Sequence, residues 1–514
     1  MKSLSICPPG WREAESKKPL NKNQSGGYTI EENQTASEMA RRFAENKMNL
    51  STSHIKDPTF KKIAQKIISE MKRLEVPGVA IGIWHNGQEF ADGFGVTSLE
   101  HPLPVTADTL FQTGSISKTC TGIMLMRLAE QGKVDLDAPV KKYIKGFKLH
   151  DRDVTKKVTV RHLLTHMGGW VGDYFNDFGN GDDALEKMVK DISKLPQVQP
   201  LGTIWSYNNT GFNVASRIIE IIAKKPYEQA AQEMLFDPIG LNVSFFYPSD
   251  LLFTHRFVVG HQKVKGKRST PQSGSVNNVH VARPWAIGRA GNGVGGVVST
   301  VRDLLKYARF HMSNGKKNVI TSKSLRAMRI PQVDAGPRGL MGITWFIRKV
   351  GDLTTYSHGG ATNGQKALFI FIPEKDFALA ILTNSDDGGI ITANIFSYAL
   401  ELYFGAKSTL PKPIKTPAKE LEKYTGRYRI GTECFDLKVK GEHLIYHHIP
   451  LGGFPRPDTP PGPAMPPMHF SFYENDKVIG LDEPYKDVLG DFIRSERGKL
   501  QYFRIGGRAH KKIK

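Results

Sequence analysis

The chain of 514 residues is 39% hydrophobic and 24% charged, a balance typical of folded globular proteins and not of disordered chains. It is longer than one ordinary domain, so we expect two domains with flanking tails. The formal net charge of +21 is dispersed along the sequence. A nucleic-acid-binding protein concentrates its basic residues on one element, so the sequence predicts a basic, solubilising surface and no specific nucleic-acid partner.

Cysteine spacing and the length of apolar runs narrow the class of protein further. The three cysteines, Cys7, Cys120 and Cys434, lie far apart and form no CxxC pair, which predicts neither a disulfide framework nor a zinc knuckle. No run approaches the roughly 18 consecutive apolar residues of a membrane span, so no transmembrane segment is expected. The first residues lack the apolar run of a secretory signal, and the expected location is therefore cytoplasmic.

The N-terminal part is expected to pass from a tail into a helix and a hairpin. Residues 1–56 are rich in Ser, Asn, Lys and Glu and show little periodicity, which predicts a largely unpacked tail. From Phe60 to Leu74 apolar residues recur at helical spacing, and Pro77-Gly78 marks the end of that helix. Asn86-Gly87 then joins two strand-like runs, which is the strongest short signal of a β-hairpin.

The first domain, assigned to residues 57–406, is predicted to continue with helices and to end with strands. Residues 110–341 are expected to be mainly helical and loop-rich, with Ser299 or Thr300 capping one helix. Three strand-like runs follow, LTTYSH, QKALFIFI and FALAILTN, and then a helix near Ile395–Phe404. Two early and three late strands with helices between them predict one antiparallel sheet closed by both ends of the domain, which is an α+β fold.

A second, smaller domain is expected after a linker. Residues 407–419 carry three prolines among lysines, which is typical of a linker. Residues 420–514 contain short strand-like runs separated by turns, which predicts a small all-β domain. The proline-rich run GGFPRPDTPPGPAMPP interrupts this domain as an irregular loop.

The first candidate for chemistry is Ser115 with Lys118. Gly114 precedes the serine and an apolar helix follows at once, so the hydroxyl lies among the free N–H groups of a helix N-terminus. Lys118 lies on the same helix face, and burial or neighbouring cations would lower its pKa enough for it to accept a proton. The S-x-x-K spacing also occurs at Ser53/Lys56, Ser69/Lys72 and Ser313/Lys316. Those three lie in polar stretches or inside the amphipathic helix, whereas Ser115 joins a strand-like entry to a buried helix.

Two further motifs follow in order and carry a family resemblance. They are Tyr207-Asn208-Asn209 and His358-Gly359-Gly360. Together with Ser115-Ile116-Ser117-Lys118, they make the segment 57–404 resemble the serine β-lactamase-like family, which includes penicillin-binding proteins, class C β-lactamases, D-aminopeptidases and related esterases. The resemblance implies an antiparallel sheet flanked by helices, with a helical subdomain.

The resemblance also implies roles for the middle motif. Tyr207 is the candidate general base and acid, because a tyrosine beside ammonium groups can hold a lowered pKa and move a proton. The same Tyr-x-Asn pattern occurs at Tyr174 and Tyr473, but only Tyr207 precedes a helical run in the order that the family shows. Asn209 can donate and accept, which suits a bridge between Lys118 and a substrate amide or ester.

The third motif supplies the expected binding strand and departs from the β-lactamase pattern. Gly359 and Gly360 permit close approach of an acyl group to the strand, and by resemblance the N–H groups of Ala361 and Ser115 form the oxyanion hole. His358 stands where β-lactamases carry a lysine, and a histidine is mostly neutral near pH 7. This weakens the fixed positive charge that a penicillin carboxylate would meet. The esterases and D-aminopeptidases of the family commonly carry histidine there.

Two other patterns match known binding motifs only in part. His162 and His166 are four residues apart, but no glutamate completes an HExxH and no third ligand is evident, so no metal site is predicted. The run Gly291–Gly296 matches G-x-G-x-x-G but lacks a clear preceding strand and a later acidic residue, so no dinucleotide site is predicted. No cofactor is implied.

The sequence therefore predicts a serine hydrolase that acts through an acyl-enzyme on a small-molecule or peptide ester or amide, as an esterase or a D-amino-acid-type peptidase. A β-lactamase or an acyltransferase with the same site is an alternative, and so is a catalytically silent scaffold with the same fold. A homo-oligomer is left open. The C-terminal domain resembles the β-barrel or lipocalin-like modules appended to some relatives; it either restricts access to the active site or only stabilises the protein or mediates assembly.

Overall fold

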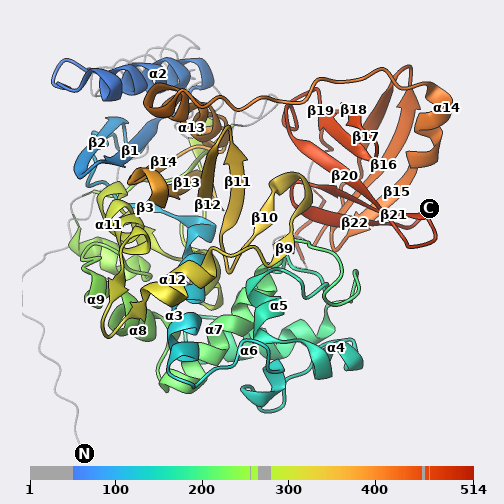
Figure 1. Ribbon diagram of the computed structural model, residues 1–514, viewed down its shortest axis with the longest axis horizontal. Coiled ribbons are helices and arrows are strands. Elements are labelled where there is room, and N and C mark those ends of the chain that lie inside the picture. Colours follow the sequence, from blue (N-terminus) through green and yellow to red (C-terminus); the bar gives the residue numbers. More distant parts are fainter. Residues whose placement is uncertain (1–49, 255, 264–278, 454–457, 462–463) are drawn as a thin grey trace, which may run out of the picture.

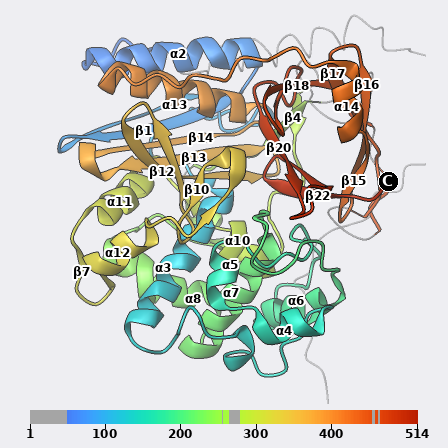
Figure 2. The same cartoon turned by 45° about the vertical axis from the view of Figure 1, so that its right-hand side comes forward.

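The computed structural model describes residues 50–254, 256–263, 279–453, 458–461 and 464–514 (Figure 1). The molecule consists of a larger body, in which helices cover a central sheet, and a barrel formed by the C-terminal residues (Figures 1 and 2). Most of the predicted N-terminal tail lies outside these ranges. None of the helices within them combines the length and the apolar character needed to cross a membrane.

An eight-stranded antiparallel sheet forms the centre of the larger body. Its strands, in spatial order, are β2 (Gln88–Gly95), β1 (Gly78–His85), β14 (Phe377–Thr383), β13 (Gln365–Ile372), β12 (Leu353–Thr362), β11 (Phe346–Val350), β10 (Leu340–Met341) and β9 (Val333–Asp334). The first five are the two early and three late strands that the sequence predicts, and β1 pairs with β14 to join the two ends of the domain. The sequence does not predict β9, β10 and β11, because β9 and β10 have only two residues each and the buried and exposed residues of β11 do not alternate.

The structure confirms a predicted turn and a predicted helix cap. Asn86 and Gly87 have φ angles of 48° and 81°, as a type I′ turn between β1 and β2 requires. Thr300 caps α11 (Val301–Met312), since its hydroxyl accepts the N–H of Asp303 over 3.2 Å. The last predicted helix begins earlier than expected, at Gly388.

Helices cover both faces of the sheet (Figure 2). α2 (Pro58–Leu74) and α13 (Gly388–Phe404) lie on one face and α11 lies on the other. Successive strand residues point to opposite faces, so Leu379 and Ile381 of β14 join the core beside α2 and α13, whereas Ala380 joins the core beside α11. Burying one such leucine or isoleucine contributes about 1.5–3 kcal/mol, which makes this sheet a rigid support.

A helical subdomain lies below the sheet in Figure 1. The α-helices between β3 (Phe111–Gln112) and β9, apart from α11, are α3 (Ser117–Glu130), α4 (Arg152–Lys157), α5 (Val160–Leu164), α6 (Ala184–Asp191), α7 (Asn209–Ala223), α8 (Tyr227–Ala231), α9 (Asp237–Ile239), α10 (Asn292–Gly295) and α12 (Ser322–Met328). α3, α7 and α10 pack on one another, so three distant parts of the sequence meet there.

The C-terminal residues form a closed antiparallel barrel, which confirms the predicted small all-β domain. After α14 (Ala418–Leu421), its strands are β15 (Gly426–Ile430), β16 (Glu433–Lys440), β17 (His443–His448), β18 (Met468–Glu474), β19 (Lys477–Gly480), β20 (Leu489–Arg494), β21 (Leu500–Ile505) and β22 (Arg508–Lys512). Aromatic side chains fill the interior: the ring centroids of Phe435 and Tyr446 are 4.3 Å apart, and those of Phe492 and Phe503 are 4.5 Å apart. This packing gives the barrel a core of its own.

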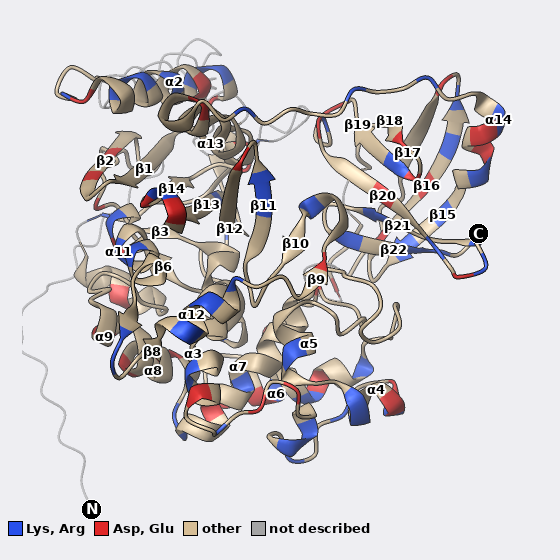
Figure 3. Cartoon of the chain, viewed as in Figure 1, with Lys and Arg blue, Asp and Glu red and all other residues tan. Residues whose placement is uncertain are grey.

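Basic residues are distributed over both bodies. Figure 3 shows lysines and arginines on helices of the subdomain, on the sheet and on the barrel strands. Several of them face carboxylates, as in the pairs Arg427–Asp436 and Arg494–Asp476 of the barrel. The dispersion that the sequence shows is therefore kept in space.

Candidate active site

Ser115 lies just before α3, in the short 3-10 turn Gly114–Ile116. Gly114 has a φ of 55°, and a Cβ atom at this position would lie 2.5 Å from the backbone nitrogen of Ala361. Only glycine combines this conformation with so close an approach of β12. The backbone of Ala361 therefore borders the turn that carries the serine.

Lys118 is fully buried and contacts Ser115. Its Nζ atom donates to Ser115 Oγ over 3.0 Å and to the carbonyl oxygen of Val294, in α10, over 2.8 Å. Burial disfavours the ammonium form and holds the pKa of Lys118 well below its usual range; Arg508 acts in the same direction and Asp173 in the opposite one. A lysine in this state can accept the proton of the serine hydroxyl.

Tyr207 is buried beside the same lysine, with its ring centroid 5.1 Å from Lys118 Nζ. Burial raises the pKa of the Tyr207 hydroxyl to about 12, although a hydrogen bond with Ser115 and the charge of Arg508 act against this. The lowered pKa expected beside ammonium groups is therefore wrong, because the phenolate loses more hydration than the cations restore. Tyr207 stays protonated and can donate a proton.

Side chains and backbone from both domains hold Tyr207. The imidazole of His166 stacks on its ring with the centroids 4.2 Å apart, and His166 Nδ1 accepts the N–H of Asn208 over 3.0 Å. The backbone N–H of Tyr207 donates to the Gly507 carbonyl of the barrel over 2.9 Å. The guanidinium carbon of Arg508 lies 4.8 Å from the ring centroid. The sequence singles out His166 only by a metal-like spacing and does not predict this stacking role.

Asn209 begins α7 and is oriented by a carboxylate. Its side-chain nitrogen donates to Asp173 Oδ1 over 2.6 Å. Asp173 in turn forms a bidentate ion pair with Arg508 of β22. The hydrogen bonds of Lys118 go elsewhere, so Asn209 has a different partner from the predicted one. Asp173 and Arg508 are 335 positions apart, and no local pattern links them.

The third motif lies on β12. His358 is buried, its Nδ1–H donates to the Gly359 carbonyl over 2.6 Å, and its Nε2 has no hydrogen-bond partner among the described residues. Burial, reinforced by the charge of Lys118, lowers the pKa of His358 to about 3, so the imidazole is neutral. A Cβ atom at Gly360 would lie 1.9 Å from the Thr113 carbonyl oxygen, so this position accepts only glycine.

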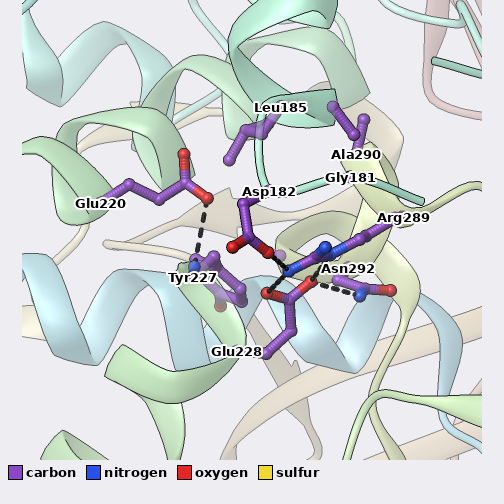
Figure 4. Close-up of a pocket in the computed structure, with 11 residues that line it drawn as sticks. Gly181, Asp182, Leu185, Glu220, Tyr227, Glu228, Arg289, Ala290 and Asn292 are labelled. Carbon is purple, nitrogen blue, oxygen red and sulfur yellow. Dashed lines mark hydrogen bonds and ion pairs between the residues drawn. The ribbon is translucent and has the colours of Figure 1, made fainter. Parts of the chain in front are cut away.

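The glycine-rich run Gly291–Gly296 has a structural role that the sequence does not predict. It forms α10, whose Val294 carbonyl accepts the lysine hydrogen bond described above. Figure 4 shows the polar cluster that fixes this helix: Asn292 donates to Glu228 over 2.7 Å, and Arg289 pairs with the same carboxylate. A satisfied, partly buried network of this kind rigidifies the helix that positions the carbonyl.

Within the described ranges, no group of three or more His, Cys, Asp or Glu side chains is arranged to hold a metal ion. His162 completes a capping box with Thr159 at the start of α5. Cys120 and Cys434 are buried free thiols.

A family model and a known protein each match more than half of this chain. The family model described as Beta-lactamase matches residues 63–395, which is more than half of the chain. Penicillin-binding protein 4 of Amycolatopsis lactamdurans is 30% identical over 329 residues, which cover 62% of this chain and 82% of that protein.

Two solved structures show the same fold. SurE with D-Leu has a TM-score of 0.69 at 21% identity and covers 88% of this chain and 99% of its own. D-amino acid amidase from Ochrobactrum anthropi SV3, complexed with L-phenylalanine amide, has a TM-score of 0.56 at 21% identity and covers 67% and 98%. The chain thus belongs to the beta-lactamase family and is a serine hydrolase.

Proposed function

We propose that the protein cleaves ester or amide bonds of small molecules or peptides through an acyl-enzyme on Ser115, as an esterase or a D-amino-acid-type peptidase. The observation that carries this proposal is the 3.0 Å hydrogen bond between a fully buried lysine and the Ser115 hydroxyl. The preference for D-configured substrates is supported by the two similar structures, of which one is described with D-Leu and the other is a D-amino acid amidase.

In the acylation step, Lys118 acts as the base. Its lowered pKa favours the neutral amine, which takes the proton of Ser115 Oγ while this oxygen forms a bond to the substrate carbonyl carbon. The N–H groups of Ser115 and Ala361 stabilise the oxyanion, because the Gly114 turn and β12 bring these two backbone segments together.

In the second half of acylation, Tyr207 acts as the acid. Its pKa of about 12 keeps the hydroxyl protonated, so it can give a proton to the leaving alcohol or amine as the carbonyl–leaving-group bond breaks. Lys118, now an ammonium, returns its proton to Tyr207. Water then attacks the acyl-enzyme with the same groups acting in reverse, and the free acid leaves.

The neutral His358 supports an esterase or peptidase over a β-lactamase. A pKa of about 3 leaves this position without charge near pH 7. A penicillin or cephalosporin carboxylate would therefore find no fixed cation at this position of β12.

The test is labelling with a fluorophosphonate probe followed by a substrate panel. Wild type should be labelled on Ser115, and Ser115→Ala should abolish both labelling and turnover. The panel contains short-chain esters, D- and L-amino-acid amides and a cephalosporin. We expect turnover of esters or D-amides and little or none of the cephalosporin; preferential hydrolysis of the cephalosporin would contradict the proposal.

The matched control for the nucleophile is Ser313→Ala. Ser313 belongs to another S-x-x-K sequence, but its hydroxyl donates to the Phe310 carbonyl at the end of α11. This variant should be labelled at the wild-type rate. Equal loss of labelling in both serine variants would remove Ser115 from the proposed mechanism.

A further inference from the structure

One ion pair connects the barrel to the active site. Arg508, the first residue of β22, places Nε 2.9 Å from Asp173 Oδ2 and Nη2 3.0 Å from Asp173 Oδ1. Both side chains are partly buried, and the pKa of Asp173 is held below its usual range by Arg508 despite burial. A bidentate arginine–carboxylate pair fixes orientation as well as distance.

Asp173 also contacts the segment that carries Tyr207 and Asn209. Its Oδ1 atom accepts from Arg508 and also from the side chain of Asn209, over 2.6 Å. The neighbouring hairpin residue Gly507 accepts the backbone N–H of Tyr207. The β21–β22 hairpin therefore contacts, directly or through one carboxylate, both functional members of the Tyr-x-Asn motif.

Further hydrogen bonds attach the same hairpin to the segment before the motif. Ala509 donates its N–H to Ser206 Oγ over 3.1 Å and accepts from the side chain of Gln199 over 2.6 Å. Arg504 donates to the Trp205 carbonyl over 3.2 Å. These contacts fix the hairpin in place without reaching Lys118.

The pair also sets the charge around Lys118. The titratable groups coupled to this lysine in the described part of the chain include His166 and His358, whose pKa values are lowered by burial so that both are neutral. Tyr207 is protonated, and α10 presents a carbonyl. The charged partners that shift the pKa of Lys118 are Arg508, which lowers it, and Asp173, which raises it.

We propose that the Arg508–Asp173 ion pair is a positioning element of the active site, through which the C-terminal barrel orients Asn209 and balances the charge next to Lys118. The inference rests on the proposed function, because it gives Lys118 the role of base. It makes the barrel part of the catalytic apparatus and not only a cover or a stabilising domain.

The test measures the pH dependence of acylation by an uncharged ester in the full-length protein. Arg508→Gln leaves the carboxylate unpaired, which raises the pKa of Lys118 and moves the acid limb of the profile to higher pH. Asp173→Asn leaves the guanidinium unpaired and moves the acid limb to lower pH. Both variants should also lose about 10-fold or more of the plateau rate, because Asn209 is no longer oriented.

Two more variants separate positioning from stability. Arg508→Lys keeps the charge but not the bidentate geometry, so the acid limb should stay near the wild-type pH while the plateau falls. Arg494→Gln is the matched control: it breaks another bidentate pair of the barrel, with Asp476 at 2.9 and 2.8 Å, that does not act on Lys118. It should lower the melting temperature without moving the limb.

The outcomes distinguish this inference from the proposed function. Opposite shifts in Arg508→Gln and Asp173→Asn support it, and the double variant should return the limb towards wild type. Shifts in the same direction, or no shift in either folded variant, overturn it. If wild type itself is not acylated at Ser115, the proposed function fails first.

Discussion

The two sides of the active site each hold a basic side chain, Lys118 or Arg508, in different electrostatic surroundings. On the α3 side, Lys118 is fully buried and its hydrogen-bond acceptors, Ser115 Oγ and the Val294 carbonyl, are uncharged, so its pKa falls. On the barrel side, Arg508 meets the carboxylate of Asp173 in a bidentate pair, and its pKa rises. Lys118 can thus lose its proton, whereas Arg508 keeps its charge and helps to lower the pKa of Lys118.

The largest expected effect on activity comes from replacing Lys118 with a residue that cannot be deprotonated. Lys118→Arg retains a positive charge that cannot be deprotonated, so it cannot take the serine proton. We expect acylation of an ester to fall by about 10²–10⁴-fold, measured by stopped-flow. Lys306→Arg, at a partly exposed helical lysine paired with Asp303, should leave the rate unchanged. Near-normal acylation of Lys118→Arg would show that this residue is not the base.

Tyr207→Phe removes the proposed acid while keeping the ring between His166 and Arg508. Because an amine leaving group needs a proton and a nitrophenolate does not, turnover of an amide should fall about 10²-fold and turnover of a nitrophenyl ester much less. In wild type, a pKa of about 12 predicts no loss of rate from deprotonation of Tyr207 below pH 10. Tyr473→Phe, in the barrel copy of the Tyr-x-Asn pattern, is the control. Equal losses on amide and ester would contradict the acid role.

Backbone geometry on the serine side gives the next largest effect. Gly114→Ala adds a Cβ atom 2.5 Å from the Ala361 nitrogen at a positive φ, whereas Gly132→Ala, also at a positive φ, meets no atom within 4 Å. Gly132→Ala should cost about 1 kcal/mol of unfolding free energy from strain alone. Gly114→Ala should cost more and also slow acylation, because the oxyanion donors separate. Chemical denaturation and acylation rates check both; equal effects would contradict the close approach.

The same contrast explains what the sequence can and cannot predict. Ser115 and Lys118 are one helical turn apart, so their contact follows from helix geometry and could be predicted. That the early and late strands share one sheet could also be predicted, because both sets of runs show strand patterns. The contact between Asp173 and Arg508 could not, since it depends on how the barrel docks on the larger body. The pKa of Tyr207 could not either, because it depends on burial that neighbouring elements create.

The smallest expected effect is a pH-dependent change in the melting temperature when the partner of Arg508, Asp173, is replaced. Because Arg508 holds the pKa of Asp173 below its unfolded value of about 3.9, the pair stabilises the fold above that pH and loses this contribution as the pH falls through the folded pKa. The melting temperature of Asp173→Asn should therefore be lower than that of wild type at pH 7, and the difference should shrink towards pH 3. Asp153→Asn, at an exposed carboxylate, should differ little from wild type at either pH. A difference for Asp173→Asn that stays constant with pH would mean that the carboxylate acts through packing alone and not through its charge.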